Sequence, residues 1–118
     1  METKDLGKCS TGIQPNVAAL LSYLIGFITG IIFYLMEKEN KFVRFHAMQS
    51  ILVFGTLTAI HLANAYVLCF FIPWMVRSLI SAIVGLGGLG LWIVLMIKAY
   101  QGEEFKLPIA GDIAEKKA

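Results

Sequence analysis

The sequence has 118 residues, of which 58% are hydrophobic and 15% charged, and its mean hydropathy is +0.74. A soluble domain of this length could not bury so many apolar side chains, because a small globule has a proportionally large polar surface. The net charge of +2 is too small and too scattered for a nucleic-acid-binding protein. The composition therefore predicts an all-α integral membrane protein, a single polytopic domain over residues 1–118 in a lipid bilayer.

Three long stretches lack Asp, Glu, Lys and Arg, and each is long enough to suggest a membrane span: residues 17–36, 45–76 and 78–97. The first predicted span covers residues 17–36, where Ser22, Gly26 and Gly30 recur every four residues and include a GxxxG pattern. Small residues let helix backbones approach closely in lipid, so this face predicts a helix contact. The alternative is that glycine is simply common in membrane helices.

The second stretch is too long for one upright helix, since its 32 residues would extend about 48 Å across a hydrocarbon core of roughly 30 Å. We expect one helix from near Lys41 to about Ile72, with a span over residues 45–72 and an N-terminal extension in the membrane interface. Asn40 is a suitable N-cap, able to accept from the backbone N–H of Phe42 or Val43. Pro73 ends the helix, because proline disfavours the α conformation in the preceding residue.

Polar side chains form a stripe on this second helix. His46, Ser50, His61 and Asn64 fall within an arc of about 60°, with Gln49 beside them. His61 is expected near mid-membrane, where a polar group is costly without a partner. A hydrogen bond to Asn64 or to a neighbouring helix is the favoured interpretation, and a path for a solute or protons is the alternative.

The third predicted span, residues 78–97, carries a second set of small residues. Ser81, Gly85 and Gly88 recur at helical spacing and predict another close-packed seam. Gly102 then stops the helix, and residues 101–118 are expected to lie on the membrane surface.

Three spans would place the basic residues unequally on the two sides of the membrane, seven against three. Basic residues accumulate on the cytoplasmic side, so the count predicts a multi-pass cell-membrane protein with its N-terminus outside and its C-terminus in the cytoplasm. The larger group comprises Lys38, Lys41, Arg44, Lys98, Lys106, Lys116 and Lys117, and the smaller group comprises Lys4, Lys8 and Arg77.

No pattern typical of catalysis is present. The spans contain no acidic residue that could serve as a general acid or base, and no His, Cys, Asp and Glu cluster has metal-ligand spacing. Cys9 and Cys69 form no metal motif, and no spacing rule supports a disulfide between them. We therefore expect no enzymatic activity, no metal and no cofactor.

Several segments carry a resemblance to a known family. The stretches NVAALLSY at residues 16–23, EKENKFVRFHAMQS at 37–50, AYQG at 99–102 and FKLPIAG at 105–111 resemble small prokaryotic Tic-like membrane proteins of unknown function. That family is distantly related to the twenty-kilodalton subunit of the plastid inner-envelope import translocon. The resemblance implies an all-helical polytopic protein. The plastid relative, which usually has four spans rather than three, is proposed to help form a protein-import channel.

Two functions remain open from the sequence. The first is a component of a protein-translocation or channel assembly, acting as an oligomer, since three helices cannot enclose a water-filled path alone. The second is a non-conducting scaffold or assembly partner of another membrane protein. In either case the partners would be copies of the chain or other membrane proteins, and the residues expected to make the interaction are Arg44, Phe45, His46, Gln49 and Ser50.

Overall fold

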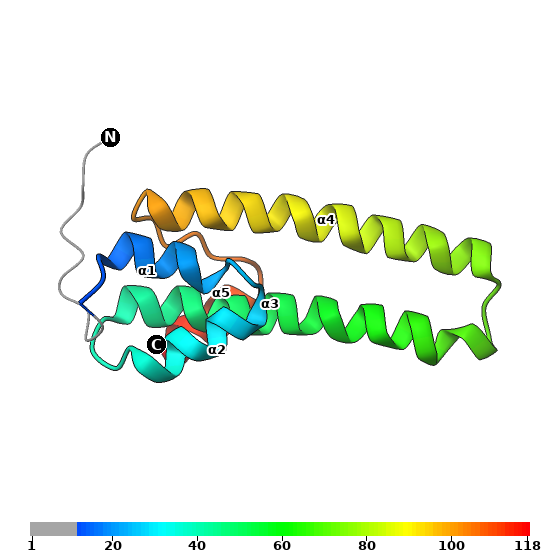
Figure 1. Cartoon of the computed structure of the whole chain (residues 1–118), viewed down its shortest axis with the longest axis horizontal. Helices are drawn as coiled ribbons and strands as arrows, with labels where there is room; N and C mark the ends of the chain where they lie inside the picture. The colour runs from blue at the N-terminus through cyan, green and yellow to red at the C-terminus, as the bar shows by residue number, and fades with distance from the viewer. Residues whose placement is uncertain (1–11) are drawn as a thin grey trace.

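The computed structural model describes residues 12–118, and this part of the chain contains helices and no strand (Figure 1). Two long antiparallel helices form a hairpin, and three short helices pack around one end of it. The elements in chain order are α1 (Pro15–Ser22), α2 (Phe27–Met36), α3 (Lys41–Tyr66), the 3-10 helix η1 (Leu68–Phe70), α4 (Trp74–Tyr100) and α5 (Ala110–Lys117).

The long helices α3 and α4 are the two candidate membrane spans. They contain 26 and 27 residues, or about 39 and 40 Å at 1.5 Å per residue, which exceeds a hydrocarbon core of roughly 30 Å. Both are apolar enough to cross a membrane. The predicted helix start at Lys41 and the cap at Asn40 are confirmed, because the Asn40 side chain accepts from the Val43 N–H at 3.2 Å. The helix ends earlier than predicted, at Tyr66 rather than Ile72.

The prediction that residues 17–36 form a third span is wrong. The helix breaks after Ser22 and resumes at Phe27, and Gly26 between them has φ of +59°, a conformation that glycine adopts at little cost. The two pieces have 8 and 10 residues, about 12 and 15 Å, so neither can cross a membrane. In Figure 1 the chain runs along α1, turns, and returns along α2 at the same end of the hairpin.

The molecule therefore has two unlike ends. We call the wide end the one formed by α1, α2, the first turns of α3, the last turns of α4 and residues 101–118 (Figure 1). The narrow end is the turn at residues 67–73 with the helix ends beside it. The Asn16 side chain donates to the Tyr100 carbonyl at 3.1 Å, and the Tyr34 hydroxyl donates to the Lys117 carbonyl at 2.8 Å. The start of α1 and the end of α5 thus share the wide end, instead of lying on opposite sides as three spans would require.

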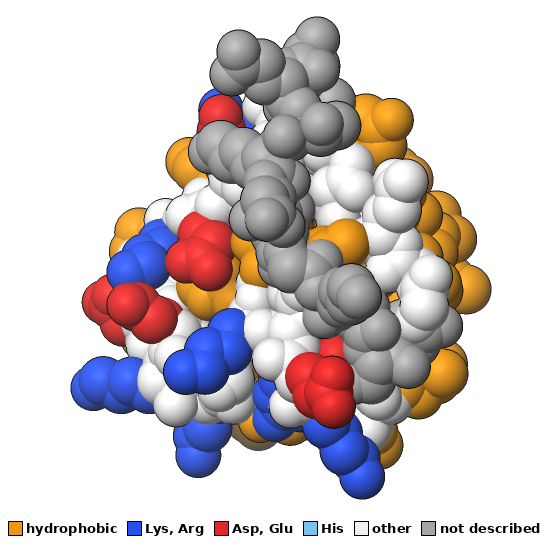
Figure 2. All heavy atoms as spheres, turned by 90° about the vertical axis from the view of Figure 1, so that its left-hand side faces the viewer, with side chains coloured by type: hydrophobic (Ala, Val, Ile, Leu, Met, Phe, Trp, Pro, Cys, Tyr) orange, Lys and Arg blue, Asp and Glu red, His pale blue; other side chains and the backbone are white. Residues whose placement is uncertain are grey.

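Charge and core both concentrate at the wide end. Viewed from that end, basic and acidic side chains gather over one part of the surface (Figure 2). The narrow turn instead exposes large apolar side chains, Phe70, Phe71 and Trp74 among them. The buried apolar cluster lies mostly at the wide end and consists of Ala18, Ala19, Tyr23, Phe42, Val43, Phe54, Leu95 and Ala99. The short helices are therefore packed parts of the fold.

Gly102 ends α4 as predicted, with φ of +80°. The Glu103 N–H bonds the Lys98 carbonyl at 3.0 Å and the Gly102 N–H bonds the Ala99 carbonyl at 3.1 Å, which is the Schellman arrangement. The chain then reverses and runs back along α3 as an irregular segment, residues 103–109. The predicted surface tail is thus partly packed, and it ends in the eight-residue helix α5.

Candidate functional site

The first turns of α3 carry a buried polar cluster that joins three separate segments of the chain. His46 and Gln49 are both fully buried and lie three residues apart, so they share one face of the helix. The Glu103 carbonyl can only accept, so His46 Nε2 donates to it at 2.9 Å. His46 Nδ1 then accepts from the Tyr23 hydroxyl at 2.7 Å. This pattern fits a neutral imidazole held between α1 and the tail.

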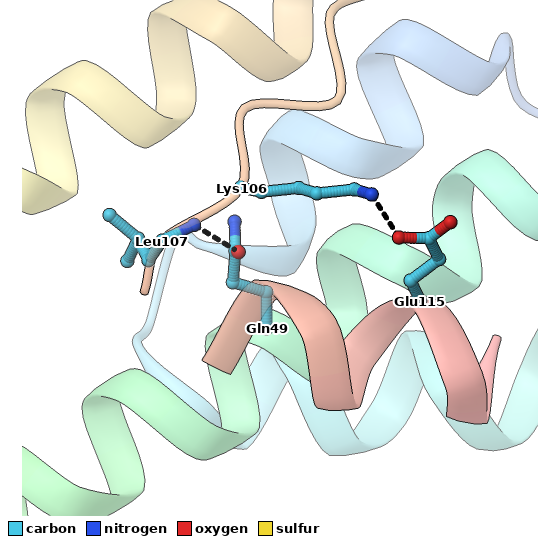
Figure 3. A network of polar contacts seen from close by, with 4 residues as sticks. All are labelled: Gln49, Lys106, Leu107 and Glu115. Atoms are coloured by element: carbon cyan, nitrogen blue, oxygen red, sulfur yellow. Dashed lines mark hydrogen bonds and ion pairs between the residues drawn. The ribbon is translucent and has the colours of Figure 1, made fainter. Parts of the chain in front are cut away.

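Gln49 uses its whole amide in the same cluster. Its Nε2 donates to the Tyr23 hydroxyl oxygen at 3.1 Å and to the Phe105 carbonyl at 2.9 Å. Its Oε1 accepts from the Leu107 N–H at 3.1 Å (Figure 3). We call the side chains of Tyr23, His46 and Gln49, with the backbone of residues 103–107, the wide-end network.

The network holds the tail through its backbone. The tail groups that bond to α3 belong to Glu103, Phe105 and Leu107, alternate residues of an extended segment, which point to the same side. Lys106 points the other way and forms an ion pair with Glu115 of α5 (Figure 3). This hydrogen bond raises the pKa of Lys106 above its ordinary value. A Cβ at Gly111 would lie 2.8 Å from Lys106 Cα, so α5 can approach the tail only with glycine there.

The broken helix at Tyr23–Gly26 is supported by side chains from both long helices. Ser50 Oγ donates to the Gly26 carbonyl at 2.8 Å, and Trp92 Nε1 of α4 donates to the Tyr23 carbonyl at 2.6 Å. Thr29 Oγ1 accepts from the Ile25 N–H at 3.1 Å. In lipid, backbone groups released from a helix must find partners within the protein. These bonds supply such partners for the backbone at Tyr23, Ile25 and Gly26.

The predicted small-residue face has a different use from the one expected on a continuous helix. Ser22 Oγ is buried and donates to the Ala18 carbonyl at 3.0 Å, and Gly26 forms the turn itself. Gly30 provides the close approach to α3, because a Cβ there would lie 2.9 Å from the Ala47 carbonyl oxygen. Of the three small-residue positions, only Gly30 makes the close contact with another helix that was predicted.

Arg44 caps the C-terminus of α2. Its Nη1 donates to the carbonyls of Tyr34 and Glu37 at 2.9 and 2.7 Å, and its guanidinium lies 4.1 Å from the centre of the Tyr34 ring. A cation at a helix C-terminus satisfies free carbonyls and interacts favourably with the helix dipole. Phe45 is buried with its ring edge against His46, at 5.1 Å between centroids. The side chains of the motif from Arg44 to Ser50 thus make contacts within the chain itself.

The remaining polar residues of the predicted stripe lie in the narrower half. Asn64 is buried and bonds reciprocally with Arg77 of α4: Asn64 Nδ2 donates to the Arg77 carbonyl at 3.0 Å, and Arg77 Nη1 donates to the Asn64 carbonyl at 3.3 Å. His61 is half-buried and has no hydrogen-bond partner within residues 12–118. It lines a cavity of about 260 Å³ at the tip of the α1–α2 turn, together with Ile25, Gly26, Phe27, Phe54, Leu57, Thr58, Val84, Gly85 and Gly88. The stripe is therefore divided into two separate groups.

The seam predicted on α4 is likewise divided. A Cβ at Gly88 would lie 3.1 Å from Leu57 of α3, so this glycine packs against the neighbouring helix. Gly85 meets nothing within 4 Å and lines the cavity, while Ser81 is exposed.

Comparison with known proteins places this architecture in a family. Residues 11–114 match the magnetosome magnetite crystal formation protein family, which is nearly the whole chain. The chain belongs to that family.

Its relatives are named as membrane proteins. A UPF0132 membrane protein of Methanocaldococcus jannaschii is 51% identical over 113 residues, covering 94% of each chain. A UPF0132 membrane protein of Archaeoglobus fulgidus is 49% identical over 105 residues, covering 89% of this chain and 96% of the relative. No solved structure matches. An uncharacterised prokaryotic membrane family, as expected from the motifs, is confirmed, and the distant relationship to the plastid import subunit stays a prediction.

Sequence reasoning missed several residues that hold this family member together. Tyr23 and Thr29 lie in an apolar run and have no predicted role, whereas Trp92 is expected only on the packing seam of the third span and not as a hydrogen-bond donor to the turn. The tail contributes backbone atoms, which leave no side-chain pattern. The usable signal was a Tyr and a Thr within a few residues of Gly26, since hydroxyls near a glycine can satisfy a broken helix. Within residues 12–118 no group of three His, Cys, Asp or Glu could hold a metal ion. Cys69 is a free, exposed thiol, and Cys9 lies outside the described residues.

Proposed function

We propose that this member of the family is a non-conducting, non-enzymatic membrane scaffold. Its two spans anchor it, and its wide end presents a rigid charged surface to a partner protein. The observation that carries the proposal is that the polar side chains of the motif at residues 44–50 bond within the chain. Arg44, His46, Gln49 and Ser50 all bond to the chain's own α2, turn or tail. The family name refers to magnetite crystal formation; the scaffold role requires no iron binding by this chain.

The surface left for a partner is the exposed charge around the motif. Residues of the α2–α3 loop, the tail and α5 contribute to it, and acidic and basic groups are interspersed (Figure 2). The exposed charged residues of these segments are Lys38, Glu39, Lys41, Glu104, Lys106, Asp112, Glu115, Lys116 and Lys117. Such a mixed surface favours a protein partner of complementary charge pattern.

We propose that this wide end faces the cytoplasm of a cell in which the protein is a multi-pass membrane protein. Seven of the described basic residues belong to wide-end segments, and Arg77 is the one described basic residue near the narrow turn. Basic residues favour the cytoplasmic side, so this distribution supports a cytoplasmic wide end.

A second candidate is an oligomeric component of a translocation or channel assembly. One observation favours it: Gly85, Gly87 and Gly90 of α4 have nothing within 4 Å of an added Cβ, so a second helix could approach closely there. His61 would then line a path between copies. On this hypothesis His61→Leu would abolish flux while the protein stayed folded.

Two measurements on the purified, reconstituted protein and on native membranes test the proposal. The scaffold role predicts that liposomes containing the protein show no flux of ions or small solutes above empty liposomes. It also predicts that a photo-cross-linking residue at exposed Lys38 or Lys116 forms reproducible adducts with one partner protein in native membranes.

The control for cross-linking is the same photo-cross-linking residue at Leu86, which is 71% exposed on α4 and would face lipid if α4 spans the membrane. Adducts from Lys38 and Lys116 but not from Leu86 support the scaffold. Flux from the wild-type protein that is lost in His61→Leu supports the channel assembly and rejects the scaffold.

A further inference from the structure

The two halves of the molecule have different cross-sections in the plane of the membrane. The narrower half contains only α3 and α4, whereas at the wide end α1 and α2 lie beside them (Figure 1). The turn between α1 and α2 reaches Phe54, because a Cβ on Gly26 would lie 3.5 Å from Phe54 Cβ. Phe54 is 13 residues into α3, or about 20 Å from its start. The α1–α2 hairpin therefore extends along about half of the long helices.

The outer surface of this hairpin is suited to lipid. Large apolar side chains are exposed from its tip to the end of α2: Leu24, Ile25, Ile28, Ile31, Ile32, Leu35 and Met36. Exposed apolar residues continue on α4 at the same end, including Ile93 and Ile97. This surface is continuous with the lipid-facing surface of the two spans, and an apolar area of this kind in contact with water would be unfavourable. The hairpin thus belongs within one leaflet as a re-entrant element.

Insertion of the hairpin makes the two leaflets unequal. A helix with its side chains is about 10–12 Å across and so occupies roughly 100 Å² of membrane area. The two helices of the hairpin alone give the leaflet at the wide end an excess of roughly 200 Å² of protein area for each copy, and α5 lies at the same end. The Ser50, Trp92 and Arg44 bonds fix the hairpin to the long helices, so this difference is built into a rigid unit.

We propose that the protein has the shape of a wedge and accumulates in curved regions of the membrane, with its wide end in the convex leaflet. In a curved bilayer the convex leaflet has more area for each molecule than the concave leaflet. A wedge with its wide part in the convex leaflet fills that area with protein, whereas the opposite orientation adds to the crowding of the concave leaflet. The ligand recognised is the shape of the lipid surface, and no particular headgroup is required.

Membrane tubes pulled from giant vesicles test this directly. The protein carries one dye, at a cysteine introduced at exposed Lys116 in a background with Cys9→Ser and Cys69→Ser, and it is reconstituted in both orientations. We expect molecules with the wide end outside to be enriched several-fold in the tube relative to the vesicle. After an impermeant quencher removes their signal, the remaining molecules, with the wide end inside, should be depleted from the tube.

A matched pair of variants tests whether the hairpin is the cause. Ile28→Lys puts a charge near the hairpin tip and opposes its insertion, whereas Leu35→Lys, near the end of α2, can extend its ammonium to the headgroups. The first should lose the enrichment and the second should retain it. Equal density of the wild-type protein in tube and vesicle for both orientations would overturn the wedge. Enrichment that survives Ile28→Lys in a protein with unchanged helical content would overturn the role of the hairpin.

Discussion

Replacing Gln49 by leucine should release the tail from α3 without disturbing the two spans. The substitution keeps the approximate size of the side chain and removes three hydrogen bonds, those to the Tyr23 hydroxyl, the Phe105 carbonyl and the Leu107 N–H. A typical intramolecular hydrogen bond contributes about 1 kcal/mol net, so the loss is about 3 kcal/mol. Desolvated groups left without partners would increase this cost.

The assay is hydrogen–deuterium exchange in detergent micelles, read by peptide and combined with the thermal unfolding midpoint. A local loss of about 3 kcal/mol corresponds to a more than hundredfold rise in the opening equilibrium of the tail. Exchange should therefore accelerate at residues 103–109, while the middle of α4 keeps its protection. The control is Thr56→Ala, which removes an exposed hydroxyl bonded only to its own helix, at Leu52, and should change neither quantity appreciably.

An unchanged exchange rate at residues 103–109 in a folded Gln49→Leu protein would refute this reasoning. It would mean that the tail is held by other contacts, such as the packing of α5 on α3, and that Gln49 is incidental. Faster exchange over the whole chain would also contradict it, since that would make the network a condition for the entire fold.

Three further substitutions test the other parts of the wide end. Gly30→Ala should lower the thermal midpoint in detergent by crowding a carbonyl of α3, at a cost of about 1–3 kcal/mol, while Gly87→Ala, which meets no neighbour, should leave it unchanged or slightly higher. Trp92→Phe removes the donor to the Tyr23 carbonyl and should cost about 1–3 kcal/mol, with faster exchange confined to residues 20–30; unchanged exchange there would exclude Trp92 as a support of the turn. Arg44→Leu should loosen the end of α2, and protease cleavage after residue 36 that is no faster than in the wild type would contradict its capping role.

The long helices could be predicted from sequence because their signals are local. Asn40 marks the start of α3 as an N-cap, and Gly102 marks the end of α4 with a positive φ. Both signals depend on neighbouring residues alone. The uncharged runs between them are long enough to cross a membrane. The end of α3 was less well predicted, because residues 67–72 are as apolar as the helix before them and only tertiary structure decides where the helix stops.

The break between α1 and α2 could not be found by the same reasoning. Residues 17–36 have the length and hydropathy of a span, and Gly26 with Gly30 has the spacing of a contact face. Whether a glycine packs in a helix or turns the chain depends on partners elsewhere, here Ser50 and Trp92. The motif around His46 was recognised as important, but several of its partners are backbone atoms of the tail, 56 to 58 residues away along the chain. The sequence thus indicated the α3 residues of the site but not the tail residues that bond to them.

We infer that the first apolar run enters the membrane and returns, so that the chain crosses the membrane twice. Single cysteines at exposed Gln14 and Lys116, in a background with Cys9→Ser and Cys69→Ser, allow a direct test with an impermeant thiol reagent on intact cells and on lysed cells. The structure predicts that both positions react from the same side, protected in intact cells if the wide end is cytoplasmic. Labelling of Gln14→Cys in intact cells, with Lys116→Cys labelled only after lysis, would show that residues 17–36 cross the membrane and would contradict the re-entrant hairpin.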